Sequence, residues 1–141
     1  MDSPIELIDP LRIIVSMGLF ILIWLVQLII YPSFAFAAVE TFTQWHKRYT
    51  GLITIFVAPL MLLQTTAFAW QAFFLGRWHD WVGFALVVTC WIATFCLSVP
   101  CHDALQRQGY DLKIIKRLVR TNWIRTAAWT AVFVLDASRY C

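Results

Sequence analysis

Residues 13–38 read IIVSMGLFILIWLVQLIIYPSFAFAA, a stretch that contains no charged side chain. An α-helix needs about 20 mainly apolar residues to cross the hydrocarbon core of a bilayer. Three further apolar stretches of similar length follow, at 51–75, 81–100 and 121–138. The sequence therefore predicts an all-α fold, a transmembrane four-helix up-down bundle, in which residues 1–141 form a single integral-membrane domain.

The composition agrees with a membrane protein. Of the 141 residues, 61% are hydrophobic and 13% are charged, whereas about a quarter of the residues in an ordinary globular domain are charged. The formal net charge of +3 comes from basic residues beside the spans, where anionic lipid head groups attract them. The charge therefore indicates contact with membrane lipids and predicts no nucleic-acid partner.

Lysine and arginine are distributed unequally between the two ends of the predicted bundle. Arg12, Arg77 and Arg139 belong to the end that holds both termini. A larger set belongs to the opposite end: Lys47, Arg48, Arg107, Lys113, Lys116, Arg117 and Arg120. Because the more basic end normally faces the cytoplasm, we expect both termini on the non-cytoplasmic side. The acidic leader before the first span favours a retained helix over a cleaved signal peptide.

The predicted connections and prolines define how the helices run. The connections are short, at 39–44, 77–80 and 104–112. Consecutive helices are therefore expected to be antiparallel neighbours. Pro32, Pro59 and Pro100 each fall within a predicted span, where a proline removes one backbone donor. We expect kinked helices at these three positions.

Polar residues at membrane depth gather near the cytoplasmic end of the predicted bundle. An ionisable group at that depth is costly and normally faces the bundle interior. The candidate polar pocket combines residues from all four helices: Tyr31, His46, Tyr49, His102, Asp103, Asn122 and Arg125. Gln64 lies on the second helix about 27 Å beyond His46, at 1.5 Å per residue. Gln64 is therefore expected outside this pocket.

The residues of the pocket have alternative interpretations. Imidazole suits zinc, copper and iron, so His46 and His102 are candidate ligands for a metal, haem or pigment. One of them is also a candidate general acid or base. The more common situation is a histidine that only ends a helix or meets head groups. Arg125 needs partners for five permanent donors, and an ion pair with Asp103 is favoured over binding of an anion or substrate.

Several short motifs resemble those of a known group of proteins. The sequence reads VPCH at 99–102, GYD at 109–111 and TNWIRT at 121–126. These motifs resemble a group of small four-helix bacterial membrane proteins, distantly similar to the anthrone-oxygenase-like family. That family shares a proline-polar motif after its third helix and an asparagine-arginine pair on its fourth. The resemblance implies a multi-pass protein of the bacterial inner membrane.

The chain departs from that pattern at three positions. Relatives typically have two further histidines and a glutamate where this sequence has Ile30, Tyr49 and Gln64. If the relatives bind a metal or oxidise a substrate with that set, this chain retains only His46 and His102. Two nitrogen ligands make a poor mononuclear metal site but remain suitable for haem. The losses favour a role without catalysis.

Two functional hypotheses remain, so the sequence leaves open whether the chain is an enzyme. The favoured hypothesis is an accessory or stabilising subunit that packs against other membrane protein subunits of a larger redox or photosynthetic inner-membrane complex. The alternative is an intramembrane oxygenase-like enzyme that acts on a lipophilic aromatic or quinone-like substrate. A transporter or channel is disfavoured, because no polar track passes through Phe56, Leu60 and Leu63.

Overall fold

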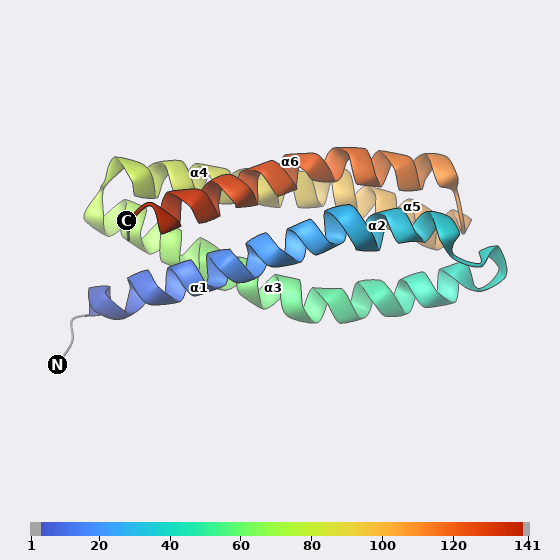
Figure 1. Ribbon diagram of the computed structural model, residues 1–141, viewed down its shortest axis with the longest axis horizontal. Coiled ribbons are helices and arrows are strands. Elements are labelled where there is room, and N and C mark those ends of the chain that lie inside the picture. The colour runs from blue at the N-terminus through green and yellow to red at the C-terminus, as the bar shows by residue number, and fades with distance from the viewer. Residues whose placement is uncertain (1–3, 140–141) are drawn as a thin grey trace.

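The computed structural model describes residues 4–139, and this range is entirely helical apart from short connections. Four helical rods lie side by side and alternate in direction, so that the start of α1 and the end of α6 lie at the same end of the bundle (Figure 1). The first rod contacts the second and the fourth, and the third rod contacts the same two. The predicted all-α up-down arrangement of four helices is therefore confirmed.

Each rod is longer than the span predicted for it. The first rod comprises α1 (Pro4–Leu25), a π-helical turn (Val26–Ile30), α2 (Tyr31–Ser33) and a 3₁₀ turn (Phe34–Phe36). A second 3₁₀ turn (Val39–Thr41) leads to the second rod, α3 (Phe42–Leu75). The third rod comprises α4 (Trp78–Ala93), a π-helical turn (Thr94–Ser98) and α5 (Val99–Gln108), and the fourth is α6 (Leu112–Ala137).

The connections after α3 and α5 are shorter than predicted, because each contains a glycine that stops the helix abruptly. Gly76 has φ 64° and ends α3, and Gly109 has φ 83° and ends α5. Glycine adopts this left-handed conformation without steric strain. The Asp111 carboxylate then accepts hydrogen bonds from the backbone of Lys113 and Ile114 and caps α6. The expected connections at 77–80 and 104–112 therefore included helical residues.

The three prolines differ in their surroundings. Pro59 lies within α3, and the helix continues past it to Leu75. Pro32 and Pro100 each follow a π-helical turn by two residues. In these turns the backbone N–H groups of Tyr31 and Val99 reach back five residues, to the carbonyls of Val26 and Thr94. The wider turn shifts the hydrogen-bond register just before the residue that has no N–H to donate.

The outer surface of the bundle is apolar. Three segments are long and apolar enough to cross a membrane: Ile8–Phe36, Val39–Leu75 and Trp78–Gln108. Large apolar side chains such as Ile14, Phe56 and Phe95 are more than half exposed, which in water would leave a very large unfavourable patch. These features are those of a membrane protein. The fourth rod, α6, is not among these segments: basic residues such as Lys116 and Arg120 occupy its first half, and Asn122, Arg125 and Asp136 lie on its buried face.

The interior has a polar region towards each end, and the middle between them is mainly apolar but contains some hydrogen-bonded side chains. Tryptophans in mid-rod join the helices there through their indole N–H groups. Trp24 donates to Thr130 at 3.1 Å, and Trp91 donates to Thr65 at 2.8 Å. Helix packing therefore accounts for both tryptophans. The polar region at the end where α3 and α6 begin contains the predicted pocket residues, and the other surrounds Arg12.

Candidate functional site

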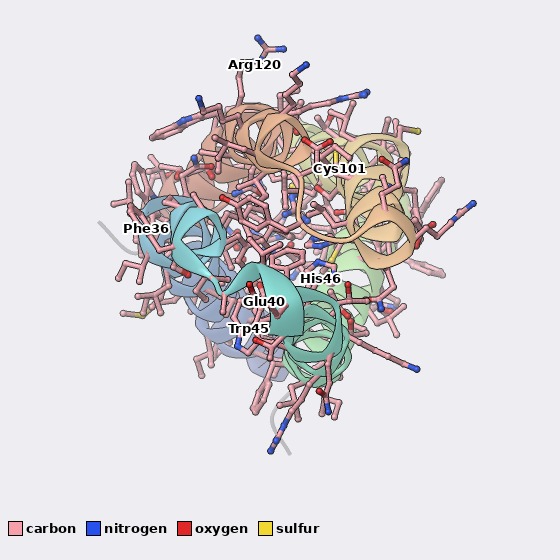
Figure 2. The ribbon with its side chains drawn as sticks, turned by 90° about the vertical axis from the view of Figure 1, so that its right-hand side faces the viewer. Phe36, Glu40, Trp45, His46, Cys101 and Arg120 are labelled. Carbon is pink, nitrogen blue, oxygen red and sulfur yellow. The ribbon has the colours of Figure 1, made fainter. Side chains whose placement is uncertain are left out.

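The pocket residues converge from all four rods at the end of the bundle where α3 begins and α5 ends. Figure 2 views the molecule from this end and shows His46 on the inner side of the bundle, whereas Arg120 projects outward. His46 is 1% exposed and Arg125 is 6% exposed. The antiparallel topology therefore brings together side chains that lie far apart in the sequence, as expected.

Four hydrogen bonds connect Arg125 to Gln106 through Tyr31 and the two histidines. Arg125 Nη2 lies 3.1 Å from Tyr31 Oη, which lies 3.0 Å from His102 Nε2. His102 Nδ1 lies 2.9 Å from His46 Nε2. His46 Nδ1 in turn lies 3.2 Å from Gln106 Oε1. We call these five residues the relay.

The direction of the relay follows from its two ends. Gln106 Nε2 donates to the Thr43 carbonyl at 3.4 Å, so its Oε1 faces His46 and can only accept. His46 Nδ1 is therefore the donor, and a neutral His46 then accepts at Nε2 from His102 Nδ1. His102 Nε2 is left as an acceptor for the Tyr31 hydroxyl. At the other end, the Arg125 guanidinium can only donate to Tyr31 Oη, which fits the same direction.

Arg125 has neutral hydrogen-bond partners and no carboxylate partner among the described residues. Besides Tyr31, its guanidinium donates to Asn122 Oδ1, with Nε at 2.9 Å, and to Thr94 Oγ1 at 3.2 Å. The predicted ion pair with Asp103 is wrong. Asp103 is more than half exposed and lies 3.9 Å from Arg107, one helical turn along α5. The side chain of its neighbour His102 points into the bundle instead, where it contacts Tyr31 and lines the pocket.

A pocket of about 320 Å³ adjoins the relay. Tyr31, His46, His102, Gln106 and Arg125 all contribute to its lining. The remaining walls are largely apolar and come from all four rods, with Leu22, Val57, Val99 and Trp129 among them. Exposed residues of α3 and α5, Lys47, Thr54 and Asp103, also line the pocket, which therefore reaches the surface between these two helices.

Two other predicted pocket residues have different positions. Tyr49 lines the pocket and stacks on Trp45, with ring centroids 5.8 Å apart. Asn122 does not line the pocket. It lies behind Arg125 and holds the guanidinium through its Oδ1, while its Nδ2 donates to Gln27 Oε1 at 2.9 Å. Asn122 is therefore suited to positioning Arg125 rather than to contacting a pocket occupant.

Sequence reasoning missed three polar residues of this region. Gln106 lies four residues after His102, on the same face of α5, and this spacing could have identified it. Thr94 belongs to the π-helical turn, where the wider turn changes which residues face the interior. The regular α-helical periodicity of the sequence does not reveal that Thr94 faces inward. Gln27 is buried and joins the first rod to α6, because its Oε1 accepts hydrogen bonds from Asn122 and Thr126.

The second polar region, around Arg12, was not predicted, because Arg12 was expected at the rim. Arg12 is 1% exposed. It forms ion pairs at 2.7 Å with both Asp80 and Asp136, and it donates to Gln71. Its guanidinium carbon lies 4.3 Å from the centre of the Phe68 ring. We call Arg12, Asp80, Asp136 and Gln71 the Arg12 cluster, which joins one residue from each rod.

A line of polar side chains runs between the two regions through the bundle interior. Ser16 donates to Asp136 at 2.6 Å, and Gln64 donates to Ser16 at 3.1 Å. Trp129 then donates to Gln64 at 3.0 Å and lies with its ring 5.9 Å from the Arg125 guanidinium. Gln64 is thus outside the relay, as expected. Since an amide and an indole N–H do not readily pass protons onward, the relay has no proton path to the other end through this line.

His46 and His102 have no free ring nitrogen in this arrangement, because each of their four ring nitrogens makes a hydrogen bond. Within residues 4–139 there is no group of three or more His, Cys, Asp or Glu side chains placed to hold a metal ion. Ligation of a metal, haem or pigment by His46 or His102 would require one of these nitrogens to leave its present partner. The cofactor hypothesis stays a prediction.

Comparisons of the chain with protein-family models, with curated proteins and with solved structures find no match. The resemblance to the anthrone-oxygenase-like family is therefore also still a prediction. The features that point to a function are the direction of the relay, the unusual partners of Arg125 and the apolar pocket beside them.

Proposed function

We propose that the chain is an intramembrane enzyme that removes a proton from a lipophilic aromatic or quinone-like substrate. The observation that carries the proposal is the relay, whose donors all point from Arg125 toward Gln106 and whose members line one pocket. General acid or base catalysis requires a positioned group within hydrogen-bond reach of the reacting proton. Tyr31 Oη fits this requirement at the pocket wall.

In the proposed step, a phenolic O–H bond of the substrate breaks and its proton joins Tyr31 Oη. The original Tyr31 proton moves to His102 Nε2, as the His102 Nδ1 proton moves to His46 Nε2. The products are a substrate oxyanion near Arg125 and an imidazolium at His46, so protons and charge balance. The two hydrogen bonds on either side of His102 then have the opposite direction, which is how the relay would store the proton.

The surroundings favour this chemistry. Most of the pocket wall is apolar, as is typical of small-molecule sites with a few convergent polar groups. An apolar, water-poor site also strengthens the interaction between Arg125 and a developing negative charge. We also propose that all four rods, including α6, cross a bacterial inner membrane. The polar residues Asn122, Arg125 and Asp136 are compatible with this, because α6 packs between α1 and α4 with these side chains turned inward.

The proposal is tested with 2-naphthol, a two-ring phenol whose absorption differs between its neutral and ionised forms. The purified chain in detergent should ionise part of the bound 2-naphthol at neutral pH, relative to empty micelles. Tyr31→Phe should abolish the ionised fraction without preventing binding, whereas the exposed-site control Arg107→Gln should behave as the wild type. Bound 2-naphthol that stays neutral in the wild type would contradict the proposal.

A second candidate function is the accessory subunit, and an exposed aromatic surface favours it. Phe73, Phe74 and Trp78 are 66%, 73% and 72% exposed near the turn between α3 and α4. Phe73 also packs edge-on against Trp81, with centroids 4.9 Å apart. Aromatic side chains suit both a membrane interface and a protein partner. Purification from native membranes in mild detergent should yield a stoichiometric partner protein if this role is correct, and the chain alone if it is not.

A further inference from the structure

The two buried arginines of the bundle are neutralised in different ways. Arg12 is 1% exposed and has two carboxylate partners, Asp80 and Asp136, each at 2.7 Å. Arg125 is 6% exposed, and its partners are the neutral groups of Asn122, Thr94 and Tyr31. No ion pair involves Arg125 within the part of the chain that the structure describes. The positive charge of Arg125 therefore has no internal counter-charge of this kind.

A buried guanidinium without a carboxylate is energetically unfavourable. Hydrogen bonds satisfy its donors, but neutral partners replace only part of the hydration that the charge loses in a medium of low dielectric constant. At membrane depth this cost is largest, and such residues normally pair or serve a ligand. Asp103 lines the same pocket, but it is exposed and lies beside Arg107 at 3.9 Å.

We infer that the pocket binds a lipophilic oxyanion whose negative charge neutralises Arg125. This inference rests on the proposed role of the pocket as a binding site, and it names the charge and the class of the occupant. The anionic oxygen lies at the wall formed by Arg125 and Tyr31. The apolar body lies against Leu22, Val26 and Val57, which line the same pocket.

The size of the pocket limits the occupant. A cavity of about 150 Å³ is sufficient for benzene, and this pocket has about twice that volume, at about 320 Å³. A two-ring aromatic carboxylate or phenolate therefore fits inside. A larger molecule fits if part of it extends through the opening between α3 and α5, where Lys47 and Thr54 are exposed.

The test compares two probes of nearly the same shape, 2-naphthoate and its neutral amide, 2-naphthamide. A carboxylate is ionised at neutral pH, so the pair isolates the effect of charge. Binding to the full chain in detergent is measured by equilibrium dialysis, with the partition into empty micelles subtracted. We expect 2-naphthoate to bind at least about tenfold more tightly than 2-naphthamide, as for a buried charge pair.

Substitutions test whether Arg125 causes the preference for 2-naphthoate. Arg125→Gln should remove the preference for 2-naphthoate, and Arg125→Lys should retain part of it because the positive charge remains. Arg107→Gln, on the exposed side of α5, is the matched control and should leave both affinities unchanged. The comparison of the two probes on the wild-type protein does not depend on any variant folding.

The possible outcomes separate this inference from the proposed function. Equal or tighter binding of 2-naphthamide to the wild type overturns the oxyanion inference, while the pocket remains a binding site. Preferred binding of 2-naphthoate, together with 2-naphthol that stays neutral, supports the oxyanion inference and overturns the proton-transfer step. If neither naphthoate nor naphthamide binds above the micelle background, both fail.

Discussion

His46 and His102 share one hydrogen bond, and their two remaining ring nitrogens contact Gln106 and Tyr31. The hydrogen-bond partner of each ring therefore determines which of its nitrogens carries the proton. The Gln106 carbonyl oxygen accepts, so both neutral rings carry their proton on Nδ1. At the scale of single residues, the hydrogen bonds of the neutral relay therefore all have one allowed donor direction, from Arg125 toward Gln106.

We predict that both histidines are Nδ1–H tautomers when neutral. The ¹⁵N chemical shifts of the ring nitrogens distinguish a protonated nitrogen from an unprotonated acceptor, and they can be measured in detergent or lipid. Tyr31→Phe removes the donor to His102 Nε2, so that nitrogen should show the largest shift change. A neutral His46 or His102 with its proton on Nε2 would contradict the assigned direction.

A second prediction concerns Arg12. Arg12→Ala leaves the buried carboxylates of Asp80 and Asp136 without their shared cation. The free energy of unfolding should fall by about 3–5 kcal/mol, the usual effect of breaking a buried ion pair by removing one partner. Denaturant titration in micelles measures this loss. Arg107→Ala removes only an exposed pair and should have an effect near zero, so similar losses in both variants would contradict the structural role of Arg12.

At the scale of elements, a glycine allows α3 and α4 to pack closely together. Gly83 of α4 is buried, and a Cβ atom added there would overlap the ring of Phe68 on α3. The same ring faces the Arg12 guanidinium. The spacing of α3 and α4 and the position of the Arg12 cluster are therefore linked through one aromatic side chain.

We predict that Gly83→Ala destabilises the bundle by about 1–3 kcal/mol, because the added methyl group overpacks the contact with Phe68. Gly51→Ala is the matched control, since nothing lies within 4 Å of a Cβ atom there. That substitution should leave stability unchanged or raise it by up to about 1 kcal/mol, owing to the better helix propensity of alanine. Thermal unfolding followed by circular dichroism compares the two, and equal stability would refute the close approach.

The sequence was sufficient to predict the four helices and their order, because long apolar stretches separated by short polar ones leave few alternatives. It was also sufficient to bring Tyr31, His46, His102 and Arg125 to one end. It did not reveal which polar residues near the helix ends turn inward. The helix ends carry polar residues on both their buried and their exposed sides, as His46 and Lys47 show, and the π-helical turns change the register within two of the rods.

The same reason explains the two main errors about charged residues. Arg12 looked like a rim residue because it stands near the start of an apolar stretch, yet it turns inward to Asp80 and Asp136. Asp103 looked like the partner of Arg125 because both belong to the same end of the bundle. A rotation of 100° per residue along α5 directs His102 inward and Asp103 outward.

At the scale of the whole molecule, the ends of the described chain lie together and the basic residues gather at the opposite end. Figure 1 shows both chain ends at the same end of the bundle. Exposed lysines and arginines surround the other end, near the start of α3 and α6: Lys47, Arg48, Lys113, Lys116, Arg117 and Arg120. An even number of crossings and this charge asymmetry together favour one orientation.

We predict that both termini lie on the non-cytoplasmic side of the bacterial inner membrane. Alkaline phosphatase fused to either end should be active, because it requires export, whereas green fluorescent protein fused to either end by the same secretion route should be dark. A fusion in the turn at Gly109 supplies the opposite control. Termini on different sides of the membrane would mean an odd number of crossings and would exclude the four-span bundle.

The Arg12 cluster also has a consequence for biosynthesis. Its members come from four separate helices, so Arg12 and Asp80 are translated before α6, which supplies Asp136, has been made. An unpaired arginine is poorly accepted by lipid alone. We therefore expect Arg12 to stay near the head-group boundary in the nascent protein until its acidic partners arrive.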